Sequence, residues 1–117
     1  KESSAASDVY KRQVNGSVKY ETACPVTFNS KNQTESATKA AVSLLGSDKC
    51  NGNIEPRLFS EDFSVMANEK PGCFVLMGNG TSEQHSRPLH ADNYDFNDEL
   101  LVIGSSYWTE LVEQQLK

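Results

Sequence analysis

Past the middle of the chain lies a short, uninterrupted run of apolar residues, Cys73–Met77. Pro71 and Gly72 precede it and Gly78-Asn79-Gly80 follows it, so turn-forming residues close both ends. A run of this length is too short for a core helix, and it lacks the alternation of a strand with one solvated face. It therefore predicts a central strand that is buried on both faces, as in the sheet of an α/β domain.

Two longer segments have the periodicity of an amphipathic helix. From Thr34, apolar residues recur at three- and four-residue intervals until Gly46, with Asn32 or Thr34 as the expected N-cap. Asp95 or Asn97 is expected to cap a longer helix near the end of the chain. The apolar faces consist of Ala37, Ala40, Ala41, Leu44 and Leu45 in the first helix and of Leu100, Leu101, Gly104, Tyr107, Trp108, Leu111 and Val112 in the second.

A shorter helix is expected between these two. Ser60 is a suitable N-cap, and Glu61 and Asp62 follow it, where carboxylates favour the positive end of the helix dipole. A strand is expected at residues 18–21, and a short strand or a loop at residues 57–59. The alternation of strands and helices predicts an α/β layer architecture.

Composition and charge limit the size of the core and the kinds of partner. The chain has 117 residues, which suits one domain. Leu, Ile, Val and Phe account for 25 of the 117 residues, only just above the share of about 20% below which chains tend to be disordered, so the core is expected to be thin. The net charge of -5 without a basic cluster argues against a nucleic-acid partner. The apolar runs are far shorter than the roughly 20 residues of a membrane span, so no membrane partner is expected.

The cysteines bear on the cellular compartment. Cys24, Cys50 and Cys73 are an odd number without a C-x-x-C pair, which fits neither a disulfide framework nor a thiolate zinc site. Reduced cysteines are typical of a cytoplasmic protein, and that is the location we expect.

Residues 1–13 lack apolar periodicity and end in an unusual sequence. Their last six residues, Asp-Val-Tyr-Lys-Arg-Gln, resemble the translation of a transposase adapter that is used in sequencing libraries. We therefore expect residues 1–13 to be a non-native tail and the genuine sequence to begin at about Val14. The alternative is a genuine N-terminal segment that matches the adapter by chance.

The candidate functional residues lie mainly in the polar loop after the predicted central strand. Both histidines of the chain, His85 and His90, lie in this loop, at the strand edge where open α/β sheets place their ligands. An imidazole there suits a metal ligand or an acid–base catalyst, and the alternative is a surface histidine without a role. One histidine does not make a zinc site, because a catalytic zinc needs at least about three protein ligands.

Two acidic residues and two glycines are further candidates. Glu61 and Asp62 fit a helix-capping pair better than a general base. Gly78 and Gly80, with Asn79 between them, offer backbone contacts to a substrate, although the turn at the end of a strand is the simpler interpretation. The sequence contains no nucleophile elbow and no phosphate-binding loop.

Spaced motifs in this sequence resemble the C-terminal part of a family of metal-dependent amidohydrolases. The motifs are, in order, Tyr20 with Pro25-Val26-Thr27 and Asn29, then Ser60-Glu61-Asp62-Phe63, then Pro71-Gly72 with Phe74 and Gly78, and then Leu89-His90 with Tyr94-Asp95-Phe96-Asn97-Asp98. This is the family of hippurate hydrolase, the auxin-conjugate (IAA-amino acid) hydrolases and the N-acyl-amino-acid amidohydrolases, within the carboxypeptidase G and aminoacylase group. The resemblance runs from about Val14 to Lys117.

The resemblance implies a fold, a cofactor and a metal ligand. The implied fold is a helix-flanked mixed sheet in a zinc-peptidase-like catalytic domain, of which residues 29–117 are an incomplete, C-terminal part. Residues 14–28 correspond to the last strand of a lid or dimerisation domain and to the crossing that follows it. The implied cofactor is a pair of divalent ions, zinc, manganese or cobalt, which hydrolyse the amide bond of an N-acyl amino acid through an activated water. His90, in the Leu-His motif, is the implied metal ligand, whereas His85 is not a ligand.

The resemblance also marks what this sequence lacks. The family's other metal ligands and its glutamate general base lie upstream, and nothing in this sequence matches them. Glu61 and Asp62 are expected to cap a helix or to lie behind the site, with Gly78 and Gly80 near the substrate. The parent enzyme is expected to act on a small-molecule N-acyl amino acid or a peptide-like substrate and to form a homodimer through its lid domain. We expect the present chain alone to be inactive, and the alternatives are a non-catalytic binding module and an inactive family member.

Overall fold

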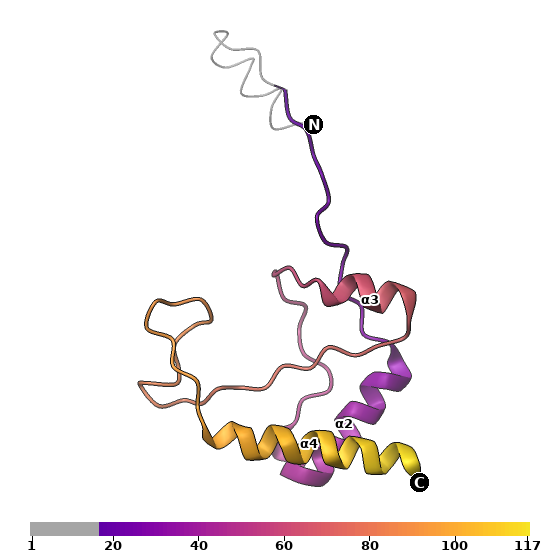
Figure 1. Cartoon of the computed structure of the whole chain (residues 1–117), viewed down its shortest axis with the longest axis vertical. Helices are drawn as coiled ribbons and strands as arrows, with labels where there is room; N and C mark the ends of the chain where they lie inside the picture. The colour runs from indigo at the N-terminus through magenta and orange to yellow at the C-terminus, as the bar shows by residue number, and fades with distance from the viewer. Residues whose placement is uncertain (1–16) are drawn as a thin grey trace.

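The computed structural model describes residues 17–117, which contain four helical segments; the first two are one residue apart and the others are joined by long connections (Figure 1). These segments are α2 at Lys31–Leu45, the short 3-10 helix η1 at Ser47–Lys49, α3 at Phe63–Glu69 and α4 at Glu99–Leu116. The predicted tail of residues 1–13 lies outside the described residues. None of the helices in this part of the chain has both the length and the apolar character that a membrane crossing requires.

Helix α2 ends as predicted but begins earlier. Its N-cap is Ser30, so the prediction of Asn32 or Thr34 was wrong. The hydroxyl of Thr34 donates to the Ser30 carbonyl at 3.0 Å, the same carbonyl that accepts the Thr34 N–H. At the other end, Gly46 has a φ of 87°, a conformation that favours glycine, and its N–H donates to the Val42 carbonyl.

Helix α3 begins at Phe63, so the prediction of Ser60 as its N-cap was also wrong. Asp62 occupies the N-cap position and makes no capping bond with its side chain. The hydroxyl of the fully buried Ser64 donates to the Glu61 carbonyl at 2.6 Å, which joins α3 to the residue before its N-cap but does not cap a helix N–H. Glu61 and Asp62 therefore precede this helix and do not form its first turn.

Helix α4 begins at Glu99 with Asp98 as its N-cap, so the prediction of Asp95 or Asn97 as the cap was wrong. The side-chain oxygen of Asn97 accepts the N–H of Glu99 at 3.1 Å, and the Asn97 carbonyl accepts the N–H of Leu100 at 3.0 Å. Asp98 occupies the N-cap position without a capping bond from its side chain. Asn97, one position before the N-cap, nevertheless supplies a side-chain acceptor for the first N–H of the helix.

A small core forms where α2 and α4 cross (Figure 1). Among the described residues, the buried hydrophobic side chains are Ala37, Ala40 and Tyr107. The Tyr107 hydroxyl donates to the Ala37 carbonyl at 3.4 Å, and the Gln114 side-chain amide donates to the Ser36 hydroxyl at 2.9 Å. Alanines on α2 allow the aromatic ring of α4 to approach closely, so the contact is small and well defined.

The apolar run that predicts a central strand is not part of a sheet in this structure. Residues 71–80 pass between α3 and the loop before α4 without regular secondary structure (Figure 1). Val75, Leu76 and Met77 remain between 46% and 50% exposed, whereas the prediction was burial on both faces. A strand is stabilised by its neighbours, and residues 17–117 contain no paired strand beside this run. The helix-flanked mixed sheet therefore stays a prediction.

An asparagine holds the start of this run. The Asn29 side-chain amide donates to the Phe74 carbonyl at 3.0 Å, and its oxygen accepts the Phe74 N–H at 2.7 Å. Beside it, the Ser30 N–H donates to the Gly72 carbonyl at 2.9 Å. The Phe74 ring packs on Phe63 of α3, with ring centroids 5.6 Å apart. Asn29 thus makes the pair of bonds that a neighbouring strand would make, and it joins the start of α2 to the apolar run.

Tyr107 is expected to make the stability of the helix pair sensitive to alkaline pH. Burial raises the pKa of its phenol above the ordinary value of 10.0, and the electrostatic effect of Cys73 acts in the same direction. The native state therefore holds this proton more tightly than the unfolded chain does. The contribution to the free energy of unfolding should be fully present below about pH 10, and it should be lost as the pH rises further.

The measurement for Tyr107 is urea unfolding below and above pH 10. Tyr107→Phe should reduce the loss of stability that the unmodified chain shows above this pH. Tyr20→Phe is the matched control, because Tyr20 is 87% exposed, and it should leave the loss in place. Equal losses in the unmodified chain and in Tyr107→Phe would contradict the prediction.

Candidate functional site

His90, the predicted metal ligand, lies in a tight turn in the loop before α4. The Ala91 N–H donates to the Pro88 carbonyl at 3.2 Å, so residues 88–91 form a β-turn with His90 in its third position. His90 has a φ of 69°, and no other non-glycine residue of the described part of the chain has a positive φ. A positive φ at this position is the signature of a type II turn, which usually has glycine or asparagine there. The conformation costs about 1–3 kcal/mol, and such strain is concentrated at functional sites.

The side chain of His90 suits a metal ligand but does not complete a metal site. It is exposed, and no hydrogen bond or ion pair joins it to another residue of 17–117. A neutral, unengaged imidazole is a common ligand for divalent transition metals. Within the described residues, no three His, Cys, Asp or Glu side chains are grouped so that they hold a metal ion. His90 therefore fits the role of one ligand, and the described residues by themselves do not fit a whole metal centre.

Asn79 closes the loop that carries His90. Its side-chain nitrogen donates to the carbonyls of His85 at 3.1 Å and Asp95 at 2.7 Å. Its side-chain oxygen accepts the N–H of Asn97 at 2.9 Å, and its backbone carbonyl accepts the Asn97 side-chain amide at 3.1 Å. These four bonds join the two ends of the loop, residues 80–96, to each other and to the start of α4.

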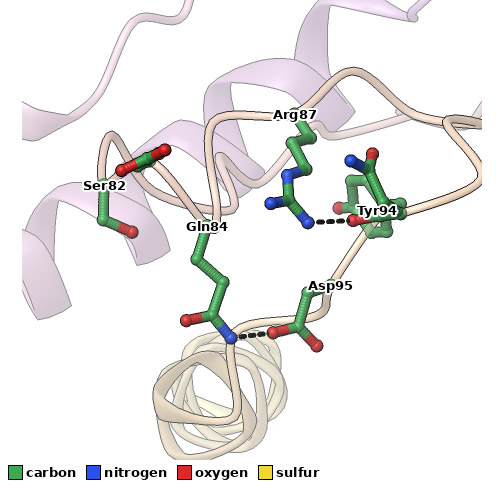
Figure 2. Close-up of a pocket in the computed structure, with 7 residues that line it drawn as sticks. Ser82, Gln84, Arg87, Tyr94 and Asp95 are labelled. Atoms are coloured by element: carbon green, nitrogen blue, oxygen red, sulfur yellow. Dashed lines mark hydrogen bonds between the residues drawn. The ribbon is translucent and has the colours of Figure 1, made fainter.

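Further polar contacts cross the loop around a shallow pocket of about 630 Å³ (Figure 2). The Arg87 guanidinium donates to the Asn93 carbonyl at 2.5 Å, next to Tyr94. On the other side of the pocket, the Gln84 amide donates to the carboxylate of Asp95. The His85 Nε2 atom lies 4.0 Å from the same carboxylate, so His85 is engaged within the loop, whereas His90 is not. The hydrogen bonds of Gln84 and Arg87 join the arm of the loop before His90 to the arm after it.

The predicted acidic residues do not gather around His90. Glu61 and Asp62 lie at the start of α3, which Figure 1 shows well apart from the loop before α4. Glu61 is half-buried and Asp62 is exposed. Both residues precede α3, and Asp62 makes no capping bond with its side chain. A role of either residue behind the active site stays a prediction.

The two predicted glycines differ in their surroundings. Gly78 is exposed, and nothing lies within 4 Å of the place where a Cβ atom would be. Gly80 has a φ of 131°, and a Cβ atom there would lie 3.1 Å from the Cβ of His85. Only glycine adopts this conformation without strain, so Gly80 shapes the entry to the loop. A contact of either glycine with substrate stays a prediction.

Sequence reasoning missed the residues that hold the loop in place. Asn79, between two glycines, predicted a turn or a backbone contact to substrate, yet its side chain bonds to residues up to 18 positions away. Gln84, Arg87 and Asp95 were not singled out as partners. An asparagine that follows an apolar run is the one available signal, because its amide pairs readily with free backbone groups in turns.

Comparisons with known proteins give consistent results. The sequence pattern of Peptidase family M20/M25/M40 matches residues 9–114. Hippurate hydrolase of Campylobacter jejuni is 32% identical over 93 residues, which are 80% of this chain and 23% of that protein. IAA-amino acid hydrolase ILR1-like 2 of Arabidopsis thaliana is 34% identical over 98 residues, which are 80% of this chain and 21% of that protein. The chain thus spans less than a quarter of the length of these curated relatives. No solved structure matches the chain significantly.

Proposed function

The chain belongs to Peptidase family M20/M25/M40, and from this premise we propose that it is the C-terminal part of a metal-dependent amidohydrolase in which His90 binds a metal ion. The observation that carries the proposal is the strained turn at His90, which presents an unengaged imidazole to solvent. Strain at a non-glycine residue persists where the surrounding structure enforces it, and active sites are where it clusters. Hydrolysis is the reaction of the relatives as their names give it.

The proposed substrate is a small molecule with an amide bond to an amino acid. One relative is named for hippurate, which is a benzoyl group joined to glycine by an amide bond. The other is named for an IAA-amino acid. Both names describe an acylated amino acid, and this shared chemistry supports an N-acyl amino acid as the substrate of the parent enzyme.

Two divalent ions, of zinc, manganese or cobalt, complete the proposal. When bound, such ions lower the pKa of a water molecule and polarise the carbonyl of the scissile amide. Among the described residues, His90 supplies one ligand. The other ligands and the glutamate general base belong to an upstream part of the parent protein.

The exposure of residues 17–28 supports the proposed domain organisation. Their larger apolar side chains, Val18, Tyr20, Val26 and Phe28, are between 75% and 87% exposed. Asn29 and Ser30, directly after them, bond to residues 72–74. We therefore propose that residues 14–28 are the last strand of a lid or dimerisation domain and the crossing that follows it, and that residues 29–117 are the C-terminal part of the catalytic domain. Dimerisation through that lid and a cytoplasmic location are part of the same proposal.

Metal-dependent hydrolysis by the full-length protein is the test. The gene is extended upstream of Val14, and the protein is expressed, stripped with a chelator and assayed for release of glycine from hippurate. Activity should be absent from the stripped protein and should return with zinc, manganese or cobalt. A folded full-length protein that hydrolyses neither hippurate nor any other N-acyl amino acid with these metals would contradict the proposal and favour a non-catalytic binding module.

A further inference from the structure

We propose that Asn79 is a positioning residue for His90, an inference that rests on the proposed role of His90 as a metal ligand. Asn79 does not touch the imidazole. Its side chain bonds to backbone groups at both ends of the loop in which His90 lies, and these bonds fix the positions of the two ends.

The bonding capacity of Asn79 is used on both arms of the loop. A side-chain amide offers two N–H donors, and Asn79 gives these to the His85 carbonyl, before His90, and to the Asp95 carbonyl, after it. Its side-chain oxygen binds the Asn97 N–H. A single side chain thus joins the arm that enters the turn at residues 88–91 to the arm that leaves it.

The loop connects to the packed part of the molecule at the same place. Asn97 donates back to the Asn79 carbonyl, and its side-chain oxygen also accepts the first free N–H of α4, that of Glu99. Helix α4 in turn packs on α2 through Tyr107. The position of His90 is therefore defined relative to the helix pair, whereas the turn bond between Pro88 and Ala91 defines only its local conformation.

A metal ligand requires this kind of support. Ligands perform well when neighbouring bonds hold them within about 0.5 Å of their working geometry, and loss of such support commonly weakens metal binding about 10- to 100-fold. His90 makes no side-chain bond to the described residues that would orient it. The bonds from the Asn79 side chain to backbone groups therefore act beside the Arg87–Asn93 bond in restricting the position of His90, and together with the Asn97 bond to the Asn79 carbonyl they tie the loop to the start of α4.

The test is Asn79→Asp in the full-length enzyme, with zinc titrated into the stripped protein. Aspartate keeps the oxygen that accepts the Asn97 N–H but cannot donate to the two loop carbonyls. We expect zinc affinity to fall about 10- to 100-fold and amide hydrogen exchange to accelerate in residues 80–96 but not in α2. Asn51→Asp is the matched control, because Asn51 is exposed and its oxygen accepts only the nearby Asn53 N–H; it should change neither quantity.

His90→Ala, titrated in parallel, separates this inference from the proposed function. If His90→Ala weakens zinc binding and Asn79→Asp does not, the positioning role of Asn79 is overturned and the proposed function stands. If His90→Ala leaves zinc binding unchanged, the proposed role of His90 fails, and the inference about Asn79 fails with it. Should Asn79→Asp not fold, Asn97→Asp takes its place, because it removes only the bond to the Asn79 carbonyl. It should then weaken zinc binding about fivefold, as the loss of one hydrogen bond does, and unchanged affinity would overturn the inference.

Discussion

Replacement of His90 by alanine in the full-length enzyme should lower kcat/KM for hippurate by about 10³-fold or more. The physical reason is the loss of one imidazole from a proposed site whose ions stabilise several kcal/mol of charge in the transition state. Each loss of about 1.4 kcal/mol is a tenfold loss of rate, so a displaced ion is sufficient for this effect. The measurement is steady-state hydrolysis with metal in excess, together with the metal content of the purified variant.

The control for this substitution is His85→Ala. His85 lies in the same loop, but its imidazole faces the Asp95 carboxylate, and its bond to Asn79 is made by its carbonyl, which alanine retains. Its loss should therefore leave kcat/KM within a few-fold of the unmodified enzyme and leave the metal content unchanged. Similar activity in His90→Ala and His85→Ala would show that His90 is not a ligand.

The 117-residue chain by itself should show no hydrolysis of N-acyl amino acids, with or without added zinc, manganese or cobalt. A catalytic metal of this kind needs at least about three protein ligands and a place for water, and the described residues provide a single candidate ligand. The measurement is an assay of the purified chain with hippurate at high protein concentration, beside the full-length enzyme under the same conditions.

Metal-dependent turnover by the isolated chain would contradict this prediction. The signal would have to disappear on treatment with a chelator, return with the metal, and be absent from His90→Ala. The last of these controls separates turnover at the proposed site from turnover by a contaminating hydrolase.

The presence of the helices was predictable from this sequence, but the residues at which they begin were not. The spacing of alanine and leucine residues identified α2 and α4, because one apolar face is a local property of the sequence. The starts of α2 and α3 depend on which group takes the unpaired backbone groups of the first turn. In both helices the N-cap side chain, of Ser30 and of Asp62, makes no capping bond, and the hydroxyls of Thr34 and Ser64 donate to carbonyls, so no side chain marks these starts in the sequence.

The strand and the site depend on more distant partners. The apolar composition of Cys73–Met77 favours burial, but a β-strand also requires a neighbouring strand to pair with. Residues 17–117 contain no such strand. His90 was identified through its motif, whereas its strained turn was not predictable, because neither Leu89 nor His90 is a residue that usually marks such a turn. The role of Asn79 was hidden because its partners lie 6 to 18 residues away.

Asn29, which bonds to the start of the apolar run, and Asn79, which follows its end, have a consequence for strand register. In a sheet, a shift of one residue moves every side chain to the opposite face, so a strand needs a feature that fixes its alignment. Asn29 holds the backbone of Phe74, and Asn79 is itself fixed at the other end of the run. If the run enters the proposed sheet, it cannot slide without breaking bonds at both ends. The alternation that places Val75 and Met77 on one face and Leu76 on the other would then be set by two side chains before any neighbouring strand is added.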